Sequence, residues 1–155
     1  MTPISTFLNL KTTKQTLGIP SEVTWSPCSD GRVEHAFGGM TGGYATDWLK
    51  STSYLESLLD DDDSRIRVLI YNGDLDYVCD YMGGKAVSLS LDWKYSNEFR
   101  EVVVDHDWGN GAGLARSYGN LLTYLQVYDA GHMVPKDKPE HSLMMIEQFI
   151  NGKPL

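Results

Sequence analysis

Residues 65–84 read Arg-Ile-Arg-Val-Leu-Ile-Tyr-Asn-Gly-Asp-Leu-Asp-Tyr-Val-Cys-Asp-Tyr-Met-Gly-Gly, and they carry the main signal for the fold. The run 68–71 is apolar without a break, which is typical of a parallel strand covered on both faces, because a strand with one wet face alternates apolar and polar residues. The loop 72–76 therefore opens at the carboxyl end of a buried strand. Sites in open α/β sheets form beyond that end, so the stretch predicts an α/β fold with Asp74 and Asp76 at a functional edge.

A second strand and loop repeat this arrangement further along the chain. Residues 122–128 also have the pattern of a strand, and the loop 129–135 that follows contains Gly131 and His132. Two neighbouring strands lie about 4.8 Å apart, so an acid after one strand and a histidine after the next can share a hydrogen bond. Such a pair is the orienting half of a Ser-His-Asp triad, and the small residue before the histidine leaves room for a substrate.

The composition is that of an ordinary folded domain. The chain has 155 residues, of which 41% are hydrophobic and 22% are charged, so its length fits one domain with a real core. Only two segments have the pattern of buried parallel strands, however, and such strands need several neighbours and helices on both faces. We therefore expect the chain to be part of a larger α/β structure.

Charge and hydropathy exclude several classes of function. A net charge of −8 argues against binding to nucleic acid or to an anionic membrane, because both need clustered Lys and Arg side chains. No run approaches the roughly 20 apolar residues of a membrane span. Residues 1–5 lack the features of a signal peptide, so the protein is either cytosolic or its true amino terminus is missing. The glycines form no phosphate-binding loop and the histidines lack metal-ligand spacing, so no cofactor and no metal are expected.

The remaining patterns predict elements around the two strands. Helices are expected at 8–17, at 47–59 with Thr46 as the cap, at 83–91, and from the cap Asp137 to Gly152. An edge strand is expected at 101–105, and the segments 114–118 and 121–128 are expected to form a hairpin. Trp93 and Tyr95 are interpreted as core packing or as a cap over a pocket edge.

Four segments of the chain form a specific pattern. They are Gly73-Asp74-x-Asp76-x-x-Cys79, Trp93-Lys-Tyr95, Ser117-Tyr118 with the strand after it, and Gly131-His132-Met133-Val-Pro135. Together they resemble the carboxyl-terminal third of serine carboxypeptidases of the carboxypeptidase Y and cathepsin A type, over about residues 6–153. The resemblance implies the carboxyl-terminal part of an α/β-hydrolase fold at 45–155, preceded at 1–44 by the tail end of a helical cap.

The resemblance also implies roles for individual residues. Asp76 is expected to be the triad acid and His132 the triad base, while Asp74 competes for the acid role and is otherwise a turn residue. Three residues are expected to contact the substrate: Cys79, Met133 and Trp48. Packing within a helical core is the alternative role for Trp48. Cys28 corresponds to a cysteine that the family joins by a disulfide bond to a segment near the amino terminus of the full protein.

The serine nucleophile of the family has no match in this chain. The family places it in Gly-x-Ser-Tyr-x-Gly before the acid, whereas Ala115-Arg-Ser117-Tyr-Gly119 follows the acid and leads into a hairpin strand, so we reject Ser117. An amino-terminal segment or chain is expected to carry the serine, and the chain by itself is expected to be inactive. The joined protein would be a serine carboxypeptidase that acts on peptides in a vacuole or lysosome or outside the cell.

Two other functions are compatible with the sequence. One is a truncated, noncatalytic binding module that uses an exposed sheet edge for association. The other is part of a different α/β hydrolase such as an esterase, against which Cys79 and the segment 93–95 argue. Folding and peptidase activity of the chain by itself would separate the enzyme fragment from the module.

Overall fold

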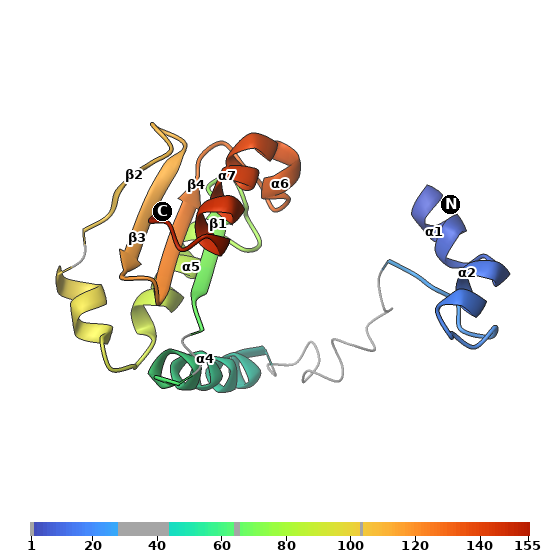
Figure 1. The fold of residues 1–155 in the computed structure, drawn as a ribbon, viewed down its shortest axis with the longest axis horizontal. Helices are drawn as coiled ribbons and strands as arrows, with labels where there is room; N and C mark the ends of the chain where they lie inside the picture. Colours follow the sequence, from blue (N-terminus) through green and yellow to red (C-terminus); the bar gives the residue numbers. More distant parts are fainter. Residues whose placement is uncertain (1, 28–43, 64–65, 103) are drawn as a thin grey trace. The chain divides into compact units, whose positions relative to one another are not determined.

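The computed structural model describes residues 2–27, 44–63, 66–102 and 104–155, and for 44–50 and 102 it describes the backbone but not the side chains. The chain divides into two compact units, Met1–Trp48 and Leu49–Leu155. Figure 1 shows the helices and strands of each unit. No helix within the described ranges is both long and apolar enough to cross a bilayer. The assignment of the amino-terminal residues to a helical cap stays a prediction.

The amino-terminal unit contains two short helices, α1 (Pro3–Leu8) and α2 (Lys11–Thr16). The Thr2 side chain caps α1, because its oxygen accepts a hydrogen bond from a backbone N–H of the first turn. The single helix expected at 8–17 is wrong at its start. Asn9 interrupts it, because its side chain donates to the Trp25 carbonyl at 3.0 Å and accepts from the Trp25 N–H at 2.8 Å.

The carboxyl-terminal unit is built on a four-stranded sheet with the order β1-β4-β3-β2. The strands are β1 (Val68–Gly73), β2 (His106–Trp108), β3 (Gly113–Tyr118) and β4 (Leu122–Val127). β1 runs parallel to β4, while β3 pairs antiparallel with β4 and β2 with β3 (Figure 1). The predicted adjacency of the two buried strands and the predicted hairpin are confirmed. The register aligns Gly73 with Val127, so β1 and β4 end at the same edge.

Helices cover both faces of this sheet (Figure 1). Along β4, Leu125 and Val127 point to the face that α7 (Pro139–Ile150) covers, where they pack in one core cluster with Met145. Leu122 and Tyr124 point to the other face, because side chains alternate along a strand. α5 (Tyr81–Ser90) contacts β1 and β4 there. The second cluster also contains Leu59, Leu91, Trp93 and Phe99, so the core interpretation of Trp93 is confirmed.

The edge strand expected at 101–105 is wrong. Glu98–Val102 forms a π-helical turn, and the strand begins only at His106. The turn buries Phe99 completely. It also directs the carbonyls of Phe99 and Arg100 toward the Arg116 guanidinium, which donates to them at 2.6 and 3.2 Å. An extended backbone would point successive carbonyls to opposite sides and could not present both to one side chain.

Three helices begin at residues other than those expected. α4 (Tyr44–Asp60) already includes Thr46, so Thr46 is not its cap. α5 begins at Tyr81, because the Asp80 carboxylate caps it by accepting from the Gly83 N–H at 2.8 Å. α7 begins at Pro139, and Asp137 instead ends a separate short helix, α6 (Val134–Asp137). The Asp137 carboxylate therefore does not cap α7.

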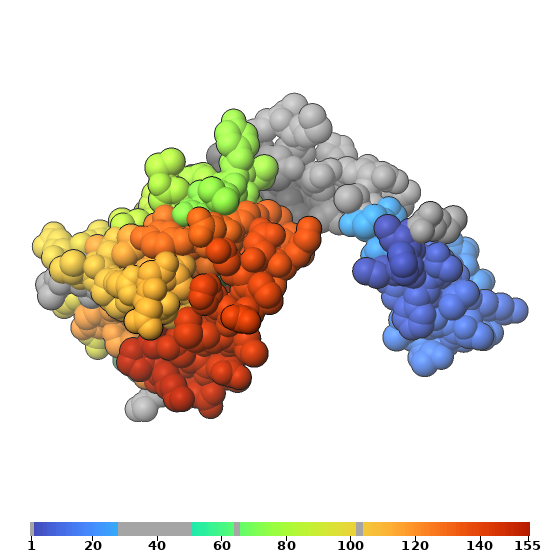
Figure 2. All heavy atoms as spheres, turned by 90° about the horizontal axis from the view of Figure 1, so that it is seen from above, coloured from blue at the N-terminus to red at the C-terminus, as the bar shows by residue number. Residues whose placement is uncertain are grey.

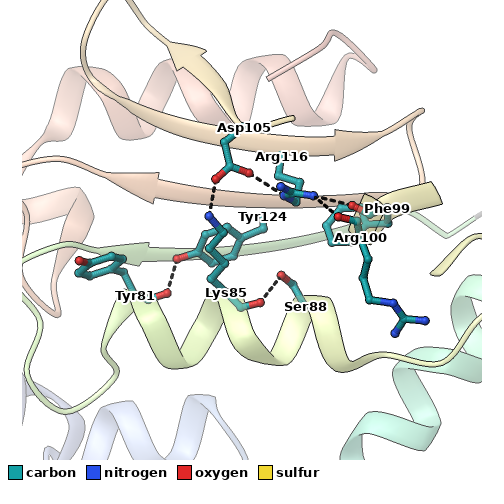
Figure 3. Close-up of polar contacts among 8 residues, drawn as sticks. All are labelled: Tyr81, Lys85, Ser88, Phe99, Arg100, Asp105, Arg116 and Tyr124. Atoms are coloured by element: carbon teal, nitrogen blue, oxygen red, sulfur yellow. Dashed lines mark hydrogen bonds and ion pairs between the residues drawn. The ribbon is translucent and has the colours of Figure 1, made fainter. Parts of the chain in front are cut away.

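A partly buried ion network fixes α5 against the sheet (Figure 3). The Asp105 carboxylate accepts from the Arg116 Nε of β3 at 2.6 Å and pairs with the Lys85 Nζ of α5. Burial raises the pKa of Asp105, but Lys85 and Arg116 outweigh this effect, and the pKa lies below the ordinary 3.8. The Tyr124 hydroxyl donates to the Tyr81 carbonyl at 2.5 Å, and burial raises its pKa. These contacts hold the helix that follows the loop after β1.

Candidate active site

Two loops meet at the carboxyl edge of the sheet, one after β1 and one after β4. Backbone hydrogen bonds join them, because the Asp74 N–H donates to the Val127 carbonyl at 3.0 Å and the Leu75 N–H donates to the Ala130 carbonyl at 2.9 Å. Gly73 permits this approach, since a Cβ at that position would lie 2.1 Å from the Ala130 oxygen. Figure 2 shows the light-green segment after β1 beside the orange segment after β4. Backbone geometry therefore sets the separation of the two loops.

Asp76 is held by the backbone of its own loop. Its Oδ1 accepts from the N–H of Val78 at 2.9 Å and from the N–H of Cys79 at 3.1 Å. Its Oδ2 lies 2.8 Å from the His132 Nδ1, and only 6% of its side chain is exposed. Burial raises the pKa of Asp76, but the Cys79 N–H, the His132 imidazole and the Val78 N–H together bring it below the ordinary 3.8. Asp76 is therefore an anion at neutral pH.

His132 faces solvent apart from this one side-chain contact. Its side chain is 65% exposed, and its Nδ1 lies against Asp76. An ionised carboxylate only accepts hydrogen bonds, so the Nδ1 carries the proton, and in the neutral ring the Nε2 is left as an acceptor. No residue in the described parts of the chain forms a hydrogen bond with that Nε2. The arrangement can therefore take a proton from a group placed beside the Nε2.

The structure brings some of the other predicted site residues to this edge. Cys79 is an exposed free thiol, and Met133 is 59% exposed beside His132. The Asp74 backbone N–H donates to the Val127 carbonyl of β4. The buried Oδ1 of Asp74 has no hydrogen-bond partner among the described residues. Trp48 lies in α4, but its side chain is outside the described residues, as is all of Cys28. Of the two acids, Asp76 forms the hydrogen bond with His132, and its role as the triad acid stays a prediction.

The same edge offers ligand atoms for a cation. Asp76, Cys79 and His132 each place one such atom within 4.8 Å of the others, in a search of the described residues. The Asp76 Oδ2 and the His132 Nδ1 are already joined by a hydrogen bond, and the Asp76 Oδ1 accepts two backbone N–H groups. A cation would have to replace the bond between the carboxylate and the imidazole. The geometry therefore favours a hydrogen-bonded pair over a metal centre.

Two residues that support the pair are missing from the sequence prediction. The Asn72 amide donates to the Cys79 carbonyl at 2.9 Å, and Gly84 makes room for it, since a Cβ there would lie 1.9 Å from the Asn72 Oδ1. The Asp137 carboxylate accepts from the Gly131 N–H at 2.9 Å. The sequence carries no sign of either contact, because Asn72 has the pattern of a loop residue and Asp137 that of a helix cap.

Ser117 lies at the other end of the sheet. Its register partner on β4 is Thr123, and the two hydroxyls share a hydrogen bond of 3.0 Å. His132 follows the opposite end of β4, beyond Val127. At about 3.3 Å per residue, Thr123 and Val127 are separated by roughly 13 Å along the strand. Ser117 therefore cannot reach the imidazole.

Comparison with known proteins identifies related sequences and structures. The sequence model described as serine carboxypeptidase matches residues 1–152. Carboxypeptidase Y of Komagataella phaffii is 37% identical over 153 residues, which are 96% of this chain and 27% of that protein. Carboxypeptidase Y of Saccharomyces cerevisiae is 38% identical over 114 residues, which are 70% of this chain and 21% of that protein. A vacuolar serine-type carboxypeptidase of Saccharomyces cerevisiae is 41% identical over 103 residues, 64% of this chain and 20% of that protein.

A solved structure has the same fold. It is a prohormone-processing carboxypeptidase from Saccharomyces cerevisiae, which matches 96% of this chain and 31% of its own chain with a TM-score of 0.61 and 24% identity. The expected carboxyl-terminal part of an α/β-hydrolase fold is confirmed. The chain spans about a third or less of the length of these related proteins.

Proposed function

Because the chain belongs to the serine carboxypeptidase family, as its carboxyl-terminal portion, we propose that it supplies the acid and the base of a serine peptidase. The observation that carries this proposal is the 2.8 Å contact between the Asp76 carboxylate and the His132 Nδ1, with the Nε2 facing outward. The complete protein would hydrolyse the carboxyl-terminal peptide bond of peptides and proteins. No cofactor is required for such a reaction.

In this reaction Asp76 and His132 have separate tasks. When a serine hydroxyl attacks the peptide carbonyl, the His132 Nε2 takes the hydroxyl proton, and the ionised Asp76 stabilises the imidazolium that forms. The imidazolium then gives its proton to the leaving amine, which leaves an acyl-enzyme. Water hydrolyses the acyl group by the same two proton transfers in the second half of the reaction. The two N–H bonds to the Asp76 Oδ1 keep the carboxylate in place throughout.

The serine belongs to an amino-terminal segment or chain in this proposal. Ser117 is too far from His132, so the nucleophile has to come from another part of the full protein. Cys79 and Met133 are exposed beside the imidazole and would line one side of the substrate site. Trp48 is proposed to contribute a wall of the same site on the basis of the family pattern alone.

The free edge of β1 is where such a segment would associate. The Val68 N–H donates to the Leu121 carbonyl and the Asp74 N–H to the Val127 carbonyl, so the even-numbered residues of β1 face β4. The N–H and C=O groups of Leu69 and Tyr71 therefore point away from the described sheet. An added strand could pair with them and cover the open edge. This contact would bring a serine from the partner segment to the carboxyl edge of the sheet.

A serine-directed fluorophosphonate tests the proposal. The full chain is combined with the amino-terminal segment of the same protein, and the labelled residue is located by mass spectrometry. We expect the label on a serine of the amino-terminal segment, and we expect His132→Ala to reduce the labelling rate at least a hundredfold. Labelling of Ser117 would refute the assignment of the nucleophile. Association of the two segments without labelling would instead support the noncatalytic binding module.

The related vacuolar enzyme suggests where the protein acts. We propose a vacuolar or lysosomal location, with secretion as the alternative in the same acidic, oxidising route. Fractionation of cells that express the complete protein with a carboxyl-terminal tag would locate it. Recovery of the tag only in the cytosolic fraction would contradict this part of the proposal.

A further inference from the structure

We propose that Asp137 is a positioning residue for His132, because its carboxylate holds the loop that presents the imidazole to Asp76. The key contact is a hydrogen bond of 2.9 Å from the Gly131 N–H to the Asp137 Oδ2. A carboxylate that accepts a backbone N–H makes a charge-assisted bond, which is stronger than a bond between neutral groups. Gly131 is the residue directly before His132 in the chain.

A glycine at this position allows the carboxylate to come close. A Cβ at Gly131 would lie 3.3 Å from the Asp137 Oδ2, which is tighter than an ordinary van der Waals contact. A side chain there would crowd the carboxylate that binds the N–H, since ordinary contact begins at 3.4 Å. Gly131 therefore leaves its N–H accessible as the donor, and Asp137 supplies the acceptor.

The residue after His132 is held by the same short helix. The Met133 carbonyl accepts from the N–H of Lys136 at 2.8 Å and from the N–H of Asp137 at 3.1 Å. α6 itself is anchored in the core, because Val134 is only 2% exposed and packs in the cluster beneath α7. Both neighbours of His132 are thus tied to α6, one through a side chain and one through the backbone.

The position of His132 depends on these hydrogen bonds at Gly131 and Met133, because few other contacts hold its side chain. Its side chain is 65% exposed, and Asp76 is its one hydrogen-bond partner among the described residues. The 2.8 Å contact with Asp76 ceases to be a hydrogen bond when it lengthens to about 3.6 Å, so a loop shift of less than 1 Å breaks the pair. An exposed ring has no core packing to prevent such a shift.

Other roles for Asp137 are weaker. Lys138 is the residue before α7, and that helix has no side-chain cap bond, so the Asp137 carboxylate is not used for capping. The ion pair between Lys138 and Asp129 also lies in this loop, but the Asp129 side chain is 80% exposed, and such pairs contribute little to a structure. The bond to Gly131 is therefore the interaction that gives Asp137 its position.

The test compares Asp137→Ala with a matched control in the full 155-residue chain. The control is Asp107→Ala, because the Asp107 carboxylate accepts from the Gly111 N–H at 2.9 and 3.1 Å in the turn between β2 and β3. Each variant loses the same kind of bond, a carboxylate on a glycine N–H. NMR measures amide exchange at the two glycines and the titration of the Asp76 carboxyl group.

We expect Asp137→Ala to accelerate exchange at Gly131 by about ten- to a hundredfold and to raise the pKa of Asp76, because the imidazole leaves the carboxylate. Asp107→Ala should accelerate exchange at Gly111 alone and leave the Asp76 titration unchanged. If Asp137→Ala leaves the Asp76 titration unchanged, as the control should, the proposal is overturned, because the bond would then have only a local structural role.

A conservative variant keeps the test decisive if the alanine variant does not fold. Asp137→Asn retains an oxygen acceptor but loses the charge, so exchange at Gly131 should rise severalfold while the Asp76 pKa stays low. Asp129→Asn removes one charge from the same loop without touching that bond and should leave Gly131 unaffected. Equal protection of Gly131 in these two variants would contradict the proposal. These readouts do not need a serine, so their outcome is independent of the proposed function.

Discussion

Replacing Gly73 by alanine should separate the two loops and break the contact between Asp76 and His132. A Cβ at position 73 would lie 2.1 Å from the Ala130 oxygen and 2.6 Å from the Gly131 oxygen. Ordinary contact begins at 3.4 Å, so the loop after β4 would have to move by about 1.3 Å. Both obstacles are backbone atoms, and no side-chain rotation can relieve them.

A shift of this size exceeds what the hydrogen bonds tolerate. The bond between Leu75 and Ala130 is 2.9 Å long and the contact between Asp76 and His132 is 2.8 Å, so each would lengthen to about 4 Å. Forcing an extra methyl group into a packed contact costs about 1–3 kcal/mol of stability. We therefore expect a protein that still folds, with a lower melting temperature and a disrupted pair.

Carbon-13 NMR of the Asp76 carboxyl group measures the state of the pair directly. In Gly73→Ala the pKa of Asp76 should rise, because the imidazole no longer stabilises the anion, and exchange at the Leu75 amide should accelerate. Gly111→Ala is the matched control, since Gly111 has a φ of +89° and no atom within 4 Å of its Cβ position. It should cost about 1 kcal/mol in backbone strain and leave the pair intact. An unchanged Asp76 titration in Gly73→Ala would show that the close approach at Gly73 does not hold the pair together.

Three further predictions concern the sheet and its surroundings. Asp105→Asn should cost about 2 kcal/mol, because two cations lose their partner. The contribution of Asp105 is fully present above the ordinary pKa of 3.8 and is lost as the pH falls from there through its lower pKa in the folded protein, so calorimetry should show a smaller loss of stability over that range for the variant than for the unchanged protein. Tyr124→Phe should cost about 1 kcal/mol in chemical unfolding, because the Tyr81 carbonyl loses its donor, and no change would contradict that bond. Tyr71→Pro should leave the melting temperature of the lone chain nearly unchanged, since the lost N–H points away from β4. The same variant should bind the amino-terminal segment at least tenfold more weakly in titration calorimetry, whereas Tyr71→Val should bind it normally.

Much of the sheet was predictable because its signals are local. The strands at 68–71 and 122–127 can be recognised from their residue types. Their adjacency was predicted from the acid and the histidine that follow them, because functional sites in such sheets form at one edge. The π-helical turn at Glu98–Val102 was not predictable. Its carbonyls are organised by Arg116, more than a dozen residues away, while the three valines at 102–104, where the turn ends, favour a strand on local grounds.

The residues that support the pair of Asp76 and His132 could not be predicted from the sequence either. Asp137 lies two residues before Pro139, which is the pattern of a helix start, and only the folded chain shows its carboxylate on the Gly131 N–H. From the sequence, Asn72 is an ordinary polar loop residue, and only the structure shows that its amide donates to the Cys79 carbonyl. Local patterns cannot distinguish a side chain that caps its own segment from one that reaches a neighbouring loop.

Residue type and apolar patterning are properties of short segments, so the available chemical groups and the strands that carry them could be predicted from the amino-acid sequence. The tertiary structure decided which acid meets the imidazole. Asp76 and His132 are 56 positions apart, and their 2.8 Å contact depends on the register of β1 with β4 and on a glycine that lets two backbones approach. A hydrogen bond tolerates errors of only a few tenths of an ångström, and that accuracy arises from contacts between segments that are distant in the chain.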